Sequence, residues 1–152
     1  MTDAKDLFVV TVGLFAAVGL ALGVVGLLSA GAAQTRFVEE AGGAAEEFGV
    51  AFLSVVHFTL LGVVLFLSPV LAAAVGVVSG TRLHDRMSAA AVAGGGSFVG
   101  FLLMAGLAVP LTNLGSGLAS VPVASVPELF GAGAILTALV GAVAGVLGSL
   151  LY

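Results

Sequence analysis

The chain has 152 residues, of which 61% are hydrophobic and 8% are charged, whereas soluble domains carry about 25% charged residues. A soluble fold of this length cannot bury so much apolar surface, so the composition excludes a soluble protein and makes lipid the solvent of most side chains. The net charge of −4, with four Lys and Arg residues, excludes the basic patch of a nucleic-acid-binding protein, and the absence of cysteine excludes disulfides and thiol chemistry.

Four long apolar segments follow one another along the chain, at about 7–31, 47–79, 88–111 and 129–151. A helix needs about 20 residues to cross a hydrocarbon core about 30 Å thick, so each segment is long enough to span a bilayer. The apolar runs are continuous rather than alternating, which favours helices over the strands of a β-barrel. The sequence therefore predicts an all-α fold, a four-helix transmembrane bundle that forms a single integral membrane domain over residues 1–152.

The first two segments differ in length. The first exceeds the apolar region of a signal peptide, which is about 7–15 residues, so we expect it to remain as a membrane helix. The second is so long that its helix must tilt, bend or protrude from the bilayer. Pro69 supplies a bend because it cannot donate to the carbonyl of Leu65, and Ser68 is placed to satisfy the carbonyl that this leaves free.

A short turn that contains Arg82 and Arg86 separates the second and third segments. Gly80 suits a left-handed cap for the helix before this turn, and Ser88 suits the N-cap of the helix after it. At the end of the third segment, Asn113 follows closely on Pro110. Two interpretations of this asparagine stay open, termination of the helix and the lining of a polar vestibule.

Basic residues are divided unequally between the two ends of the predicted bundle. Lys5, Arg82 and Arg86 fall at the end that carries both termini, and Arg36 falls at the other end. Cytoplasmic loops carry the excess of Lys and Arg in membrane proteins. We therefore expect the N- and C-termini on the cytoplasmic side.

The composition as a whole has a recognisable style. The chain is rich in Ala, Val and Gly, has Lys5 as its single lysine, and gathers acidic residues between the apolar segments. In this it resembles the small polytopic membrane proteins of extreme halophiles. The resemblance implies a halophilic membrane protein whose exposed carboxylates keep the surface hydrated in concentrated salt. It carries no motif, so it assigns no functional residue.

Small residues recur in every segment at steps of three and four, which places them on one face of each helix, and four glycine pairs have the GxxxG spacing. Small faces let backbones approach closely, so that van der Waals packing drives helix association in lipid. Packing within one bundle and self-association are both open interpretations. The candidate packing residues are Gly19, Gly23, Gly26, Gly76, Gly80, Gly96, Gly100, Gly141, Gly145 and Gly148.

His57 lies well inside the second apolar segment and shares a helical face with Ser54. Ionisable residues within a membrane are costly and are functional candidates for that reason, so these two form a candidate polar intramembrane site. One interpretation is a proton relay or an ion-coordinating role. The other is a neutral histidine that hydrogen-bonds to a hydroxyl or carbonyl of a neighbouring helix. No second buried His, Asp or Glu is expected beside it, so a metal would lack ligands.

The reactive side chains form no catalytic constellation, and all eight acidic residues fall at the ends of the segments or between them. The sequence therefore predicts a non-enzymatic integral membrane protein, a structural or accessory subunit with no cofactor and no metal. Its expected partners are the lipid bilayer and either itself or another membrane protein, not nucleic acid. A small oligomeric channel or transporter is the alternative. The expected location is the cell membrane, as a multi-pass protein, with a viral envelope or an internal membrane as the alternatives.

Overall fold

The computed structural model describes residues 4–36, 44–83, 85–116 and 126–151. Its helices are α1 (Ala4–Gln34), α2 (Ala44–Arg82), α3 (Arg86–Ser116) and α4 (Val126–Ser149). Each is long and apolar enough to cross a membrane. The predicted all-α fold of four membrane-spanning helices is therefore confirmed, and the chain has the architecture of a multi-pass membrane protein.

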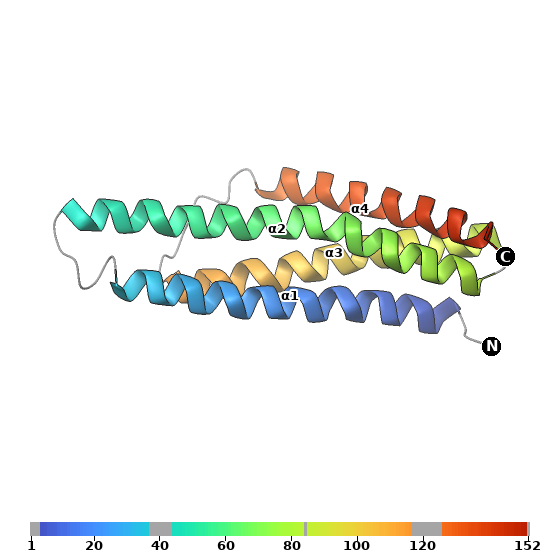
Figure 1. Ribbon diagram of the computed structural model, residues 1–152, viewed down its shortest axis with the longest axis horizontal. Coiled ribbons are helices and arrows are strands. Elements are labelled where there is room, and N and C mark those ends of the chain that lie inside the picture. The colour runs from blue at the N-terminus through green and yellow to red at the C-terminus, as the bar shows by residue number, and fades with distance from the viewer. Residues whose placement is uncertain (1–3, 37–43, 84, 117–125, 152) are drawn as a thin grey trace.

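The helices extend beyond most of the expected boundaries. The third helix continues through Pro110 to Ser116 instead of ending at residue 111, so Asn113 is part of the helix. The second helix has 39 residues, which gives it a length of about 58 Å at 1.5 Å per residue. Because this exceeds the hydrocarbon thickness of about 30 Å, α2 must tilt, bend or extend past the apolar layer. Its start projects beyond the start of α4 (Figure 1).

The turn between α2 and α3 is capped by residues other than those expected. Gly80 lies inside α2, which ends at Arg82, so it is not a left-handed cap. The N-cap of α3 is Asp85 rather than Ser88. The carbonyl of Asp85 accepts from the Ala89 N–H at 2.9 Å, and its carboxylate accepts from the Ser88 N–H at 2.8 Å. An aspartate that accepts from the third residue of a helix satisfies a donor that has no partner within the helix.

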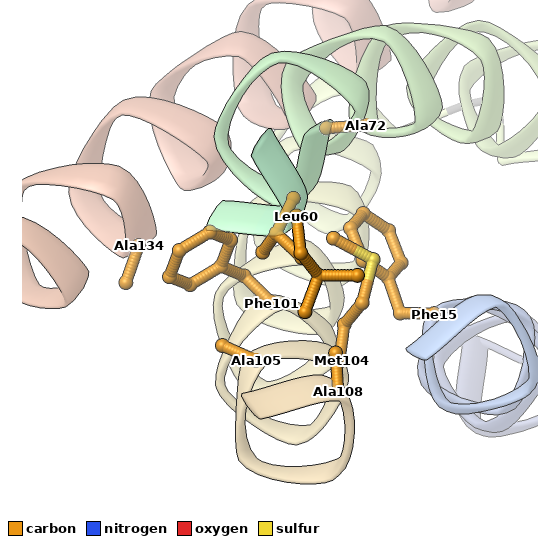
Figure 2. Close-up of a cluster of buried hydrophobic side chains, with 9 residues drawn as sticks. Phe15, Leu60, Ala72, Phe101, Met104, Ala105, Ala108 and Ala134 are labelled. Carbon is orange, nitrogen blue, oxygen red and sulfur yellow. The ribbon is translucent and has the colours of Figure 1, made fainter. Parts of the chain in front are cut away.

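The bundle is built around α2 and α3. Helix α3 contacts each of the other three helices, whereas α1 and α4 do not touch each other within the described residues. In Figure 2, α1 and α4 accordingly lie on opposite sides of a centre formed by α2 and α3. The start of α1 and the end of α4 lie at the same end of the bundle (Figure 1), as four consecutive antiparallel spans require.

The core at the centre of the bundle is filled by large side chains. Phe15 of α1 and both Phe101 and Met104 of α3 are fully buried, and Leu60 of α2 packs with them. Figure 2 shows these side chains converging between the helices, with Ala134 of α4 at the edge of the cluster. The rings of Phe101 and Phe130 meet edge to face, with centroids 6.3 Å apart, an arrangement that adds to their area burial.

Pro69 lies inside α2, where it removes one donor from the helix ladder. The hydroxyl of Ser68 donates to the carbonyl of Val64, one turn before it. The expectation that Ser68 satisfies the carbonyl of Leu65 is therefore wrong. The hydroxyl instead donates to the carbonyl of the residue four positions earlier, which is the common acceptor for serine and threonine in helices.

Candidate functional site

Five of the ten candidate glycines lie between α1 and α3. A Cβ atom at Gly19 would lie 2.5 Å from the Cα of Met104, and one at Gly100 would lie 2.8 Å from the ring of Phe15. Real Cβ atoms do not approach so closely, so these two positions require glycine for the helices to pack at this distance. The remaining contacts of this interface are Gly23 with Leu107 and Leu111, Gly26 with Thr112, and Gly96 with Thr11.

The other five candidates surround α4. A Cβ at Gly145 would lie 2.7 Å from the carbonyl oxygen of Ala89 on α3, and one at Gly148 would lie 2.5 Å from the carbonyl oxygen of Val77 on α2. Backbone atoms cannot move aside as a flexible side chain can. The remaining contacts are Gly76 with Gly141 and Ala144, Gly80 with Gly145, and Gly141 with Ala93 and Ser97. In this structure all ten candidates thus face another helix of the same chain.

The second candidate site is His57, whose ring contacts one residue of α2 and one residue of α3. Nδ1 of His57 lies 2.8 Å from the carbonyl oxygen of Leu53, one turn earlier on α2. Nε2 lies 2.9 Å from the side-chain amide oxygen of Asn113 on α3. Both ring nitrogens are therefore engaged, one within α2 and one between helices. This pair, called the His57–Asn113 pair below, is partly buried.

The His57–Asn113 pair lies near one end of the bundle. Asn113 is in the last turn of α3, which ends at Ser116, and Leu53 packs against Ala30 and Ala33 near the end of α1. Along α3 the pair is about 40 Å from Arg86 at 1.5 Å per residue, more than the hydrocarbon thickness of about 30 Å. With Arg86 at one surface of the bilayer, His57 lies near the opposite surface and not at the middle.

The two acceptor oxygens around His57 restrict its hydrogen-bonding states. The Leu53 carbonyl can only accept, so Nδ1 carries a proton and donates to it. In a neutral ring, Nε2 is then an acceptor, and the Asn113 amide must turn its NH₂ group toward it. In a protonated ring, Nε2–H donates to the amide oxygen. Rotation of one amide group therefore satisfies both ring nitrogens of His57 in either protonation state.

Ser54 and Asn113 differ in their relation to this histidine. Ser54 is half-buried on α2, three residues before His57, whereas the side chain that reaches the ring from another helix is Asn113. From the sequence, Asn113 is either a helix-terminating or a vestibule residue, and nothing there pairs it with His57. The one sequence feature that points to Asn113 is a polar amide within one helical turn of Pro110, at the end of an apolar run.

The described residues contain no group of three or more His, Cys, Asp or Glu side chains close enough to hold a metal ion. Comparison with models of known protein families finds no match, and comparisons with curated proteins and with solved structures find none either. The function of the chain is therefore inferred from the geometry of its own residues.

Proposed function

We propose that this chain is a non-enzymatic membrane protein, a structural or accessory subunit that packs with copies of itself or with a larger membrane protein in the cell membrane. The observation that carries the proposal is the filled centre of the bundle. Phe15, Phe101 and Met104 are fully buried there and meet between the helices (Figure 2). A solute path through a single bundle would have to displace these side chains.

The polar groups of the bundle support the same proposal. The most buried ionisable side chain among the described residues, His57, has both ring nitrogens engaged by Leu53 and Asn113. A group whose hydrogen-bonding capacity is consumed in this way joins helices and leaves little to act on a substrate. Hydrogen bonds between membrane helices contribute modestly, about 0.6 kcal/mol on average, so the pair adds a small stabilisation to the packing of α2 against α3.

A partner of this subunit would meet its outer surface. The ten candidate glycines face helices of the same chain, so close helix approach through them is already used within the bundle. The surface left for lipid or a partner consists of large apolar side chains, of which Phe66 is 81% exposed. Interfaces between membrane proteins that form on such surfaces depend on shape-matched van der Waals contact.

The test is a cysteine scan of the outer surface in native membranes. Because the chain has no cysteine, single substitutions need no altered background. The buried Ala134 is the matched control. The exposed positions, one on each helix, are Val25, Phe66, Leu103 and Leu139. A bifunctional thiol reagent should join at least one exposed position to a partner of defined mass, and should not join Ala134→Cys. A chain that remains uncrosslinked at every exposed position would refute the subunit proposal.

The second candidate is a small oligomeric channel or transporter that responds to protons. It is favoured by one observation, the position of the ionisable His57 within a membrane-spanning helix that it links to α3, since such residues are functional candidates. Reconstituted vesicles carrying the wild type or His57→Gln separate the two proposals, because glutamine keeps donor and acceptor atoms but does not titrate near neutral pH. A pH-dependent ion flux that glutamine abolishes, with the fold intact, would favour the channel.

A further inference from the structure

A groove opens on the outer surface between the first half of α1 and the last turns of α2. These two segments lie at the end of the bundle where α1 begins (Figure 1). Its volume is about 360 Å³. Val10 and Leu14 line one wall, and Ala74 and Val78 line the other. The exposed fraction of Val10 is 65% and that of Val78 is 49%, so the apolar walls are open to whatever surrounds the bundle.

Arg82 places a positive charge at one end of the groove. Arg82 is the charged member of its lining, and it is exposed in the last turn of α2. From Arg82 to Ala74 the groove runs about 12 Å along α2 at 1.5 Å per residue, toward the middle of the apolar layer. An arginine at the end of a spanning helix lies at the level of the lipid head groups, where its guanidinium can form paired hydrogen bonds with a phosphate.

A hydroxyl without a partner lies beneath this end of the groove. Ser79 lines the groove one turn before Arg82, and its side chain is 1% exposed. Within the described residues its Oγ makes no hydrogen bond, although a buried polar atom normally has a partner. Because Ser79 lines the groove and its hydroxyl has no partner, this hydroxyl can donate to an oxygen atom of a ligand there.

We propose that this groove binds one anionic phospholipid, with a hydrocarbon chain between Val10, Leu14, Ala74 and Val78, the phosphate on Arg82, and an ester oxygen accepting from Ser79. The lining decides between a lipid chain and a protein partner. Apolar walls that lead to an exposed arginine, with an unpartnered hydroxyl beside it, match the hydrocarbon chain, the phosphate and an ester oxygen of one phospholipid. The volume of about 360 Å³ is at the small end of the range of about 300–1,000 Å³ for ligand pockets, which suits a single flexible chain.

Native mass spectrometry of the detergent-purified protein tests the head-group part of the proposal. Phosphatidylglycerol and phosphatidylcholine are titrated separately onto the wild type, Arg82→Gln and Arg86→Gln. Arg86 is the matched control, because it is exposed at the same end of the bundle but does not line the groove. The wild type and Arg86→Gln should prefer phosphatidylglycerol by about fivefold, and Arg82→Gln should lose the preference, since one basic residue near a membrane surface contributes about 1 kcal/mol.

A bulky side chain tests the apolar part. Ala74→Phe fills the groove from an exposed position, and Ala91→Phe places the same bulk on the outer face of α3. Ala74→Phe should release the bound lipid, whereas Ala91→Phe should retain it, and circular dichroism checks that both are folded. Equal lipid binding by the two variants, or by the two arginine variants, overturns the proposal. Displacement of the lipid by inorganic phosphate alone would mean that only an anion site exists, and a second copy bound in place of the lipid would also overturn it.

Discussion

At the scale of single residues, the structure shows that the histidine within α2 has a side-chain partner on α3. His57 and Asn113 are 56 positions apart in the chain, and their side chains meet because α2 and α3 pack side by side. The Leu53 carbonyl requires a proton on Nδ1, so the amide of Asn113 is the group that turns to match Nε2. The contact therefore adds a directional hydrogen bond to the apolar packing of α2 against α3.

A double-mutant cycle measures the coupling between His57 and Asn113. We expect His57→Leu and Asn113→Leu each to lower the unfolding free energy in detergent, and the double variant to lose less than the sum. The expected coupling is about 0.6 kcal/mol, and at most about 1.7 kcal/mol, the range measured between membrane helices. His57→Gln should keep most of the stability. Strictly additive losses would mean that the two side chains act independently.

Asp85 is a second residue whose role is local. Hydrogen bonds from the Ser88 hydroxyl, at 2.6 Å, and from the Ser88 N–H, at 2.8 Å, hold the pKa of the Asp85 carboxyl below its ordinary value of 3.8. A lowered pKa stabilises the folded state above pH 3.8, and this stabilisation is lost as the pH falls through the still lower pKa of the folded protein.

Asp85→Ala should therefore unfold at a lower temperature than the wild type at pH 6, and the difference should shrink as the pH falls from about 4 toward 2. Thermal unfolding in detergent, followed by circular dichroism, measures both effects. Asp85→Asn is the control, because asparagine also caps helices but does not titrate. A difference between Asp85→Ala and the wild type that does not change with pH would show that the carboxylate charge is irrelevant to the cap.

At the scale of helices, close approach through glycine is what orders the bundle. One buried and one exposed glycine of α4 offer a comparison within one helix. A Cβ at Gly145 of α4 meets the backbone of Ala89, whereas a Cβ at Gly131 of the same helix meets nothing within 4 Å. The same substitution at these two positions therefore separates the packing contribution from the intrinsic helix propensity.

Gly145→Ala should destabilise the bundle by about 1–3 kcal/mol, the usual cost of overpacking a close interface. Gly131→Ala should leave stability unchanged or raise it by up to about 1 kcal/mol, because alanine favours helix over glycine. Unfolding in detergent measures both variants. Equal effects at the two positions would mean that α4 does not pack against α3 through this face.

The apolar runs were sufficient to predict the number and type of helices, because a bilayer imposes a minimum length that few other patterns meet. The ends were less predictable. Both Asp85 and Ser88 are good N-caps by residue type, and only the geometry selects Asp85. Likewise, the spacing of glycines defines a face but not its neighbour, so Gly145 could not be assigned to Ala89. The partner of His57 was missed for the same reason, since no pattern within α2 points to Asn113.

At the scale of the whole molecule, the basic residues are divided unequally between the two ends of the bundle. The starts of α1 and α3 and the ends of α2 and α4 share one end of the bundle (Figure 1). Lys5, Arg82 and Arg86 belong to that end, and Arg36 follows α1 at the other. The excess of Lys and Arg in cytoplasmic segments therefore predicts that this end faces the cytoplasm, and with it the lipid groove at Arg82. The His57–Asn113 pair would then face outward.

Thiol labelling of intact cells tests this orientation. Thr35 and Met87 are exposed and lie just beyond α1 and in the first turn of α3, at opposite ends of the bundle. An impermeant thiol reagent added outside should modify Thr35→Cys, and should modify Met87→Cys only after the membrane is permeabilised. The wild type is the blank, because it has no cysteine. The margin of basic residues is small, so Arg82→Glu with Arg86→Glu should weaken the bias and produce a mixture of both labelling patterns. Labelling of Met87→Cys alone in intact cells would reverse the orientation and place the basic end outside.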